Sequence, residues 1–321
     1  MTDEFSIIDQ YFAPLSAEIG DDCAILDCAP GERLAISTDT QVCGRHFPMD
    51  APPDQLAYRA LVAALSDLAA MGARPRGVTL ALTLPEAEHS FLQQFSRGVQ
   101  QALDDYSLTL LGGDTTGGPL TITYTVIGAL PPDRALKRDG AQPGDRVYIS
   151  GTPGDAAAAL TVIEGCWPGH SRFKEYLLGR YYRPTARIEL GRQLLGLASS
   201  AIDVSDGLLA DAGHICKRSG VSIRIDSAKL PLSPALASLA DRKPALEWAL
   251  GGGDDYELLF TVPPGLESEL PGGCTCIGEV VPGQGVHCDL AVGSAGYRHF
   301  QALVDHAGSE PETVPGGTAR D

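Results

Sequence analysis

Apolar residues in the first half of the chain recur first at helical and then at strand spacing. Leu61, Leu65 and Leu68 follow a possible N-cap at Asp54, which predicts a helix over residues 54–72. The next stretch, GVTLALTLP, alternates apolar with small or polar residues and ends at a proline, which predicts a strand. Apolar residues on one face predict a second helix over residues 91–103, and AISTDT, LTLL and LTITYTVIGAL are predicted strands. These elements alternate without a strict βαβ rhythm, which indicates an α+β (mixed α/β) fold.

A turn-rich stretch, RDGAQPGDRVYISG, separates this half from the second one. We expect an N-terminal domain over residues 1–142, a C-terminal domain over 143–306 and a disordered tail, poor in apolar residues, over 307–321. The second domain is expected to hold helices at 154–165 and 185–199, one that runs through 217 and one that ends in the glycines 251–253. Its predicted strands are SAIDVSDG, VSIRID and YELLFTV.

Composition limits the class of protein. The chain has 321 residues, which suits two domains, and 44% of them are apolar, which is typical of a globular protein. A formal charge of −17 argues against nucleic acid as the main partner, because phosphate backbones need clustered Lys and Arg. Phosphorylated small molecules stay possible as ligands if cations lie between their phosphate groups and the acidic side chains of the protein. The eight cysteines form no C-x-x-C pair, and no apolar run could cross a bilayer, so we expect reduced thiols and a cytoplasmic protein.

Aspartates at strand ends and turns, beside glycines and hydroxyls, recur along the chain. Each alone has a structural explanation, since aspartate often caps helices and forms turns. Asp67 is the exception, because it falls within an apolar helical stretch, where an unpaired charge is costly. The acidic corners are Asp21 and Asp22; Ser37, Thr38 and Asp39; Asp67; Asp114; Asp203 and Asp206; and Asp254, Asp255 and Glu257.

Together these corners favour a site for hard divalent cations. Carboxylate oxygens are the ligands that Mg²⁺ prefers, and Mg²⁺ bound through few protein ligands usually takes others from substrate phosphates. The sequence has no P-loop, no well-placed G-x-G-x-x-G and no protein-kinase H-R-D or D-F-G motif. The residues alone therefore predict a two-domain, Mg²⁺-dependent protein that acts on phosphates.

Several motifs in order, FSIIDQYF, IGDDCAIL, AISTDTQVCGRHF, LSDLAAMGA, LLGGDTT, SAIDVSDGL and GGDDYEL, resemble the thiamine-monophosphate kinase family. This family lies within the aminoimidazole-ribonucleotide synthetase-like ATP enzymes. The resemblance covers residues 5 to about 300. It implies a two-domain fold whose N-terminal domain pairs across a homodimer into a shared β-barrel, with ATP between the domains. It also implies transfer of the ATP γ-phosphoryl group to thiamine monophosphate, without a phosphoenzyme.

The resemblance also implies roles for individual residues. The Mg²⁺ ligands would be Asp22, Ser37, Thr38, Asp39, Asp67, Asp114, Asp203 and Asp206. ATP would meet Gly113, Asp114, Arg138 and Ser205, with Asp114 and Arg138 the catalytic pair, and thiamine monophosphate would meet His46, Asp254 and Tyr297. Asp254 stands where the family more often has glutamate, so Asp255 is a competitor for that role.

Two other readings stay open at this point. One is a synthetase of the same superfamily that activates a carbonyl oxygen or selenide; selenophosphate synthetases carry a reactive Cys in a glycine-rich setting, which Cys23 and Cys28 lack. The other is a non-catalytic protein that binds divalent ions, which the complete acidic set argues against.

Overall fold

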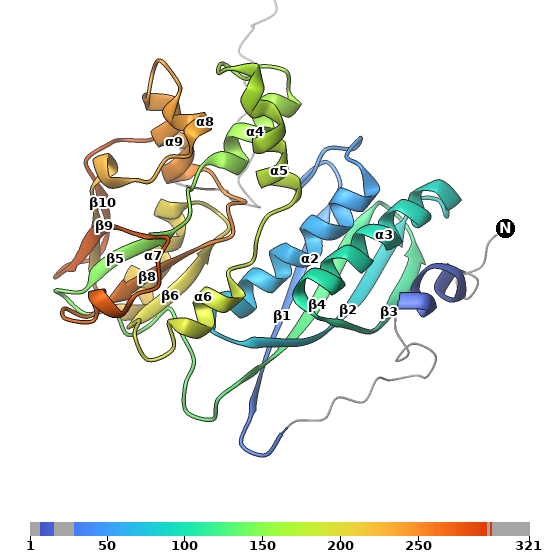
Figure 1. The fold of residues 1–321 in the computed structure, drawn as a ribbon, viewed down its shortest axis with the longest axis horizontal. Coiled ribbons are helices and arrows are strands. Elements are labelled where there is room, and N and C mark those ends of the chain that lie inside the picture. Colours follow the sequence, from blue (N-terminus) through green and yellow to red (C-terminus); the bar gives the residue numbers. More distant parts are fainter. Residues whose placement is uncertain (1–6, 16–28, 294–295, 297–321) are drawn as a thin grey trace, which may run out of the picture.

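The computed structural model describes residues 7–15, 29–293 and 296, and it contains two β-sheets (Figure 1). The first sheet has the strand order β1-β4-β2-β3, and the second has the order β10-β7-β9-β5-β8-β6. The strands are β1 (Arg33–Val42), β2 (Arg74–Leu84), β3 (Thr109–Gly117), β4 (Thr121–Leu130), β5 (Arg146–Ser150), β6 (Ser200–Val204), β7 (Ser222–Ile225), β8 (Glu257–Val262), β9 (Cys274–Val281) and β10 (Gly285–Cys288).

Eight α-helices and several short turns connect the strands within the described residues. The α-helices are α2 (Pro53–Ala70), α3 (His89–Tyr106), α4 (Asp155–Ile163), α5 (Lys174–Tyr182), α6 (Ile188–Gln193), α7 (Leu208–Ser219), α8 (Pro234–Ala237) and α9 (Lys243–Gly251). A π-helical turn, η1 (Ile8–Phe12), and the 3₁₀ turns η2 (Ala13–Leu15), η3 (Ser171–Phe173), η4 (Ser227–Lys229) and η5 (Glu267–Glu269) complete the set.

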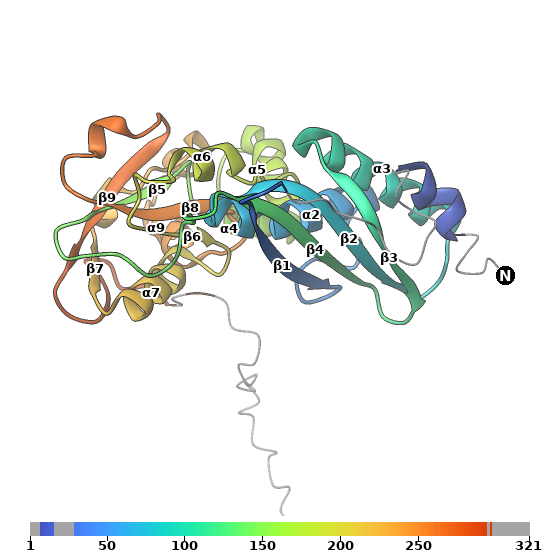
Figure 2. The same cartoon turned by 90° about the horizontal axis from the view of Figure 1, so that it is seen from below.

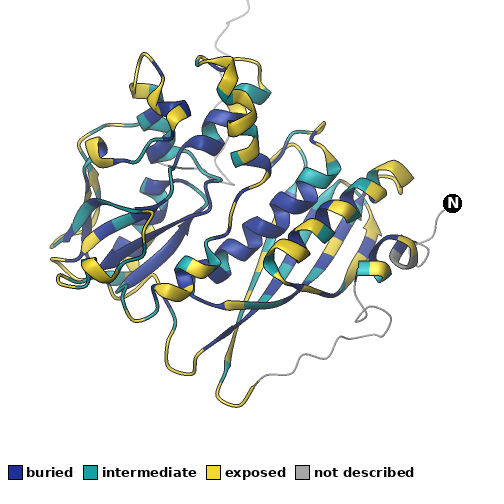
Figure 3. Ribbon diagram, in the orientation of Figure 1, coloured by how far each residue is buried: buried dark blue, intermediate teal, exposed yellow. Residues whose placement is uncertain are grey.

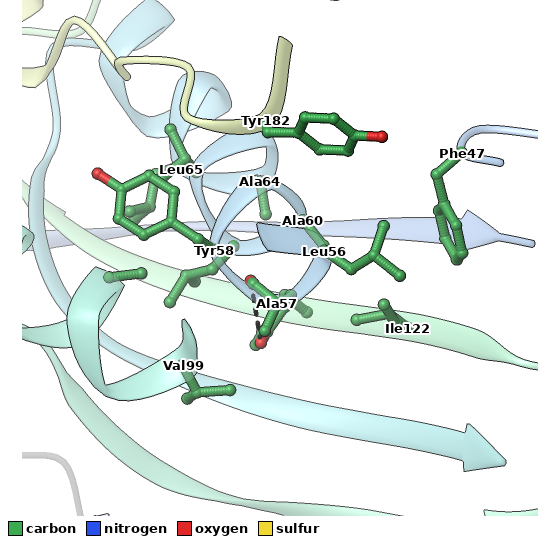
Figure 4. Packing of buried hydrophobic residues seen from close by; sticks show 14 of the residues in the cluster. Phe47, Leu56, Ala57, Tyr58, Ala60, Ala64, Leu65, Val99, Ile122 and Tyr182 are labelled. Carbon is green, nitrogen blue, oxygen red and sulfur yellow. Dashed lines mark hydrogen bonds between the residues drawn. The ribbon is translucent and has the colours of Figure 1, made fainter. Parts of the chain in front are cut away.

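Helix α2 is the central element of the molecule. It lies with α3 on one face of the first sheet, and it also packs against α5, α6 and strand β6 of the second half. Nearly all its residues are buried (Figure 3). Figure 4 shows its apolar side chains between Val99 of α3, Ile122 of β4 and Tyr182 of α5. A helix buried on all sides must hold its polar side chains against specific partners.

Two glycines permit the close packing around α2. A Cβ atom on Gly98 of α3 would lie 2.0 Å from the Asp54 carbonyl oxygen, and one on Gly191 of α6 would lie 2.0 Å from the Ala69 carbonyl oxygen. Neither position has space for a side chain, so both ends of α2 are fixed against neighbouring helices.

The other face of the first sheet is covered by no helix within the described residues (Figure 2). Strands β1 and β3 form its two edges. On β1, Leu34 and Ile36 are 43% and 63% exposed, which is unusual for large apolar side chains in a strand.

The predicted helices at 54–72 and 91–103 and the predicted strands of both halves are confirmed with small shifts of their ends. The helix predicted over 185–199 is wrong in length, since α6 ends at Gln193 and the chain turns at Leu194. Helix α5 and strands β9 and β10 were not predicted. The domain limits 1–142 and 143–306 stay predictions, and the tail 307–321 lies outside the described residues. No helix among the described residues is long and apolar enough to span a membrane.

Candidate active site

A pocket of about 1080 Å³ opens between the two halves of the molecule. The first half contributes the end of β1, the loop that follows it and part of α2. The second half contributes α4, the end of β6 and the loop before β8. The predicted site residues that line the pocket are Thr38, Asp39, His46, Asp67, Asp203, Ser205, Asp206 and Asp254. This volume is at the upper end for ligand pockets, so there is room for more than one small ligand.

Three carboxylates from different elements, Asp39, Asp67 and Asp203, repel one another in this pocket. Burial raises the pKa of Asp39, and the charge of Asp67 raises it further. Burial also raises the pKa of Asp203 to about 7, again with a contribution from Asp67. Burial raises the pKa of Asp67 as well, although the Ser37 hydroxyl donates to its Oδ2 over 2.5 Å and opposes the shift. Among the described residues, His46 and Arg138 offset these pKa shifts only in part.

The donors in this pocket fit a hard divalent cation. Together with Asp206, the three carboxylates provide oxygen ligands of the kind that Mg²⁺ prefers. Among the described residues, no three His, Cys, Asp or Glu side chains come together tightly enough to enclose an ion. The carboxylates therefore suit an ion that keeps several waters and takes further ligands from phosphate oxygens, as Mg²⁺ usually does.

The two hydroxyl residues that were predicted as metal ligands, Ser37 and Thr38, lie on opposite faces of β1. Ser37 and Asp39 lie on the face of β1 that meets α2. The Thr38 side chain lies on the opposite face, because successive residues of a strand point to opposite sides. There Thr38 Oγ1 pairs with Thr125 Oγ1 at 2.9 Å. Thr38 can therefore contribute to the pocket through its backbone, whereas its hydroxyl is turned away.

The loop after β6 is shaped by Asp211, which the sequence analysis did not select. Asp211 Oδ2 accepts the backbone N–H groups of Ser205, Asp206 and Gly207, each at 3.1 Å. Burial raises the pKa of Asp211 to about 7, with repulsion from Asp206 the next cause. This side chain fixes the turn that carries Ser205 and Asp206 into the pocket.

The three residues of the last acidic corner, Asp254, Asp255 and Glu257, do not all face the pocket. Asp254 lines the pocket, whereas Asp255 is buried and its Oδ2 accepts the Gly154 N–H at the start of α4. Glu257 is buried too, and it forms ion pairs with Arg180 and Arg187. Of the two competing aspartates, Asp254 is therefore the one placed to meet a ligand.

Arg138 lies in the exposed connection between the two sheets. Its side chain does not line the pocket, but its charge reaches Asp67 and Asp203 and partly offsets the rise that burial causes in both pKa values. Arg138 is thus near the rim of the site rather than inside it.

Gly113 and Asp114 are not brought into this pocket by the single chain. They lie on β3, at the opposite edge of the sheet from β1. Cross-strand pairing aligns Asp39 of β1 with Tyr124 of β4, Leu80 of β2 and Gly113 of β3, so these four residues form one row across the sheet. Three strand spacings separate the ends of this row, about 14 Å. A Cβ atom on Gly113 would lie 1.8 Å from the Leu80 carbonyl oxygen, so this glycine allows β3 to approach β2. The ATP contact of Gly113 that the family resemblance implies stays a prediction.

His46 has a defined ring orientation. Its Nδ1 accepts the Val42 backbone N–H at 2.9 Å, so a neutral His46 carries its proton on Nε2. Asp22 and Tyr297 lie outside the described residues, although the neighbouring Gly296 lines the pocket.

Other functional candidates were missed by the sequence analysis. Arg59 is fully buried in α2 and forms an ion pair with Asp254, and Tyr181 and Tyr256 line the pocket. Arg59 could have been found by the argument applied to Asp67, since it too is a charge within an apolar helical stretch.

Two family models match the chain: the N-terminal domain of AIR synthase related proteins over residues 20–130 and their C-terminal domain over residues 142–290. The two matches together make this chain a two-domain AIR synthase related protein. The thiamine-monophosphate kinase of Escherichia coli K12 is 50% identical over 268 residues, which cover 81% of this chain and 82% of the relative. The chain belongs to the AIR synthase related family and, within it, to the thiamine-monophosphate kinases.

Solved structures agree with this assignment. The crystal structure of the thiamine-monophosphate kinase from Stenotrophomonas maltophilia K279a has a TM-score of 0.79 at 43% identity and covers 87% of this chain and 91% of its own. A structure of the protein named AaThiL, complexed with AMPPCP and TMP, has a TM-score of 0.78 at 36% identity, with coverages of 92% and 97%.

Proposed function

We propose that this protein transfers the γ-phosphoryl group of ATP to thiamine monophosphate, which gives thiamine diphosphate and ADP. The observation that carries the proposal is the pocket lined by the buried Asp203 and the half-buried Asp39 and Asp67, which come from elements far apart in the sequence. A relative whose fold is similar was solved with AMPPCP and TMP, which are an ATP analogue and the acceptor.

The chemistry suits an acidic site. The acceptor is a phosphate oxygen that is largely ionised near neutral pH, so the protein need not remove a proton from it. The obstacle is the approach of two anions, and phosphoryl transfer is catalysed mainly by positioning and charge neutralisation. Mg²⁺ held by Asp39, Asp67, Asp203 and Asp206 would supply that neutralisation. Transfer would be direct and in line, with no phosphoenzyme.

The remaining residues divide by ligand. Ser205 at the β6 turn and Arg138 at the rim would contact ATP, since a guanidinium can donate two hydrogen bonds to a polyphosphate. His46 and Asp254 would contact thiamine monophosphate, together with Tyr297.

The working form would be a homodimer that completes this site. Asp114 and Gly113 stand at the far edge of the sheet, and the uncovered face of that sheet exposes Leu34 and Ile36. If two such faces pack together as a shared barrel, β3 of one protomer approaches β1 of its partner. Asp114 would then join the partner's pocket.

The test is direct: protein, ATP, Mg²⁺ and thiamine monophosphate are incubated, and thiamine diphosphate and ADP are measured. The proposal expects both products in equal amounts and no turnover in EDTA. Loss of ATP without thiamine diphosphate would indicate the synthetase class, and no loss of ATP would indicate a binding protein. In-line transfer predicts inversion at a chiral γ-phosphorus, whereas a phosphoenzyme would give retention.

A further inference from the structure

A buried arginine lies behind the acceptor side of the pocket. Arg59 of α2 is 0% exposed, and its partners come from two other segments of the chain. Its Nη1 donates to the Tyr181 carbonyl oxygen over 2.8 Å, and its Nη2 lies 2.8 Å from Asp254 Oδ1. The guanidinium also stacks over the Tyr181 ring, 3.9 Å from the ring centre. Burial alone would lower the pKa of Arg59, but the charge of Asp254 raises it overall, so the group stays charged.

The loop that presents Asp254 has an unusual backbone. Asp254 and Tyr256 have φ angles of 65° and 52°, and they are two of the three described non-glycine residues with positive φ. Such conformations persist where surrounding contacts fix them, and they cluster at binding sites. Here the backbone N–H of Asp254 donates to the Ser205 carbonyl oxygen, and the Tyr256 hydroxyl donates to Asp254 Oδ1 over 2.9 Å.

These contacts leave the two oxygens of Asp254 unequal. Oδ1 is engaged by both Arg59 and Tyr256, whereas Oδ2 accepts no hydrogen bond from the residues that the structure describes. The Asp254 side chain is 34% exposed and lines the pocket. The positive charge of Arg59 balances the negative charge of Asp254. The pocket therefore meets an ion pair in which Oδ2 is open to accept a hydrogen bond, and not a further uncompensated carboxylate.

The same arginine reaches His46 through Tyr181. The Tyr181 hydroxyl donates to the His46 carbonyl oxygen over 3.1 Å, and Tyr181 itself is held by Arg59 through its ring and its carbonyl. Of the three residues expected to meet the acceptor, the two that the structure describes, His46 and Asp254, are therefore connected to one guanidinium. A lysine could replace it only in part, since a single ammonium lacks the planar fork that stacks on a ring while it faces two oxygen partners.

We infer that Arg59 is a positioning residue for the acceptor site. It turns Asp254 Oδ2 into the pocket as the acceptor for an N–H donor of the ligand, such as the exocyclic amine of an aminopyrimidine. The inference rests on the proposed function and adds to it the group that sets the orientation of Asp254.

The test measures KM for thiamine monophosphate and for ATP in Arg59→Met, Arg59→Lys, Tyr256→Phe and Asp254→Ala, and in Arg59→Met combined with Asp254→Ala. A charge-assisted hydrogen bond lost from the acceptor raises its KM about tenfold or more. We expect that increase in Arg59→Met and Asp254→Ala, a partial one in Arg59→Lys and Tyr256→Phe, and a KM for ATP within about twofold of wild type. Once Asp254 is alanine, the Arg59 substitution should add little, because its effect passes through Asp254.

Controls separate this role from a purely structural one. Arg183 stacks over Tyr58 at 4.2 Å and is exposed, and Arg183→Met should leave both KM values unchanged. If Arg59→Met does not fold, Arg59→Lys tests Arg59 itself, and Tyr256→Phe removes the other donor to the same oxygen for comparison. Two results would overturn the inference for an active wild-type enzyme. One is that the effects of Arg59→Met and Asp254→Ala on the KM for thiamine monophosphate add fully in the double variant; the other is that Arg59→Met raises the KM values for thiamine monophosphate and ATP equally. A wild type that makes no thiamine diphosphate would instead overturn the proposed function and this inference with it.

Discussion

Asp203 is the next-to-last residue of β6, a strand that is buried along its whole length, and it shows how strongly the site depends on a counter-charge. Burial and the charge of Asp67 raise the pKa of Asp203 to about 7 in the absence of a bound cation. Between pH ~4 and 7 the folded chain then holds a proton that the unfolded chain has lost. This contribution to stability is present at low pH and is lost as the pH rises through 7.

Cation binding at Asp203 should have the opposite pH dependence. A carboxylate must be ionised to ligate Mg²⁺, so we expect affinity for Mg²⁺ to fall about tenfold between pH 8 and pH 6. Titration calorimetry with Mg²⁺ at both pH values measures this. Asp203→Asn should bind more weakly but lose most of the pH dependence, and a wild-type affinity that does not change with pH would contradict the prediction.

At the scale of single residues, part of the site follows from simple arguments on the sequence. Asp67 was selected because an unpaired charge within an apolar helix is costly. The structure places Asp67 in the pocket, where it accepts a hydrogen bond from the Ser37 hydroxyl. The same reasoning applied to Arg59 would have found the residue behind Asp254. Asp211 gave no such signal, since an aspartate near a helix start has an ordinary structural explanation.

Among the elements, the turn from β6 into α7 is the one most dependent on a single side chain. Asp211 Oδ2 accepts three consecutive backbone N–H groups from residues 205–207. We expect Asp211→Ala to lower the free energy of unfolding at pH 8 by about 3 kcal/mol, because three partly or fully buried N–H donors would lose their shared carboxylate acceptor. Urea unfolding measures the loss, and faster hydrogen exchange at 205–207 would locate it.

A matched control for Asp211 is available at an exposed cap. Asp226 Oδ1 accepts the Ala228 N–H and its Oδ2 forms an exposed ion pair with Lys229, so Asp226→Ala should cost about 1 kcal/mol or less. If Asp211→Ala were no more destabilising than this, the turn would be held by other contacts.

The elements that were missed share a weak pattern. Helix α5 has nine residues and buries only Leu177, Tyr181 and Tyr182, which are too few apolar positions for a helical repeat to be recognised. Strand β10 has four residues and follows a glycine turn, which is too short for alternation to be recognised. Long, strongly periodic elements such as α2 were predicted because one repeat dominates their sequence.

At the scale of the whole molecule, the location of Asp114 could not be predicted from the sequence. The order β1-β4-β2-β3 puts the strand of Asp114 at the far edge from Asp39, and strand order is set by long-range pairing rather than by local pattern. The motif GGDTT predicts a metal-binding aspartate, which stays a prediction, and it gives no information on where in the sheet that aspartate lies.

The proposed dimer makes a prediction about the uncovered sheet face. Ile36 is 63% exposed there, and a charge in its place would be buried against the partner. Ile36→Glu should yield a folded monomer by light scattering and circular dichroism, with kcat reduced about a hundredfold or more if Asp114 acts across the interface. Met49, which is 86% exposed outside the sheets, serves as the control, and Met49→Glu should remain dimeric. A dimeric Ile36→Glu would place the interface elsewhere.

Mixing two inactive variants tests whether each site draws on both protomers. Asp114→Asn and Asp203→Asn should each fold and lose turnover, because Asp114 is exposed on an edge strand and Asn keeps the shape of either side chain. If Asp114 of one protomer serves the pocket of the other, a mixed dimer contains one site with both mutations and one site with neither. Random reassortment gives half mixed dimers, so activity should return to about a quarter of wild type. If both aspartates of a site came from the same chain, every site would carry one mutation and mixing would restore nothing.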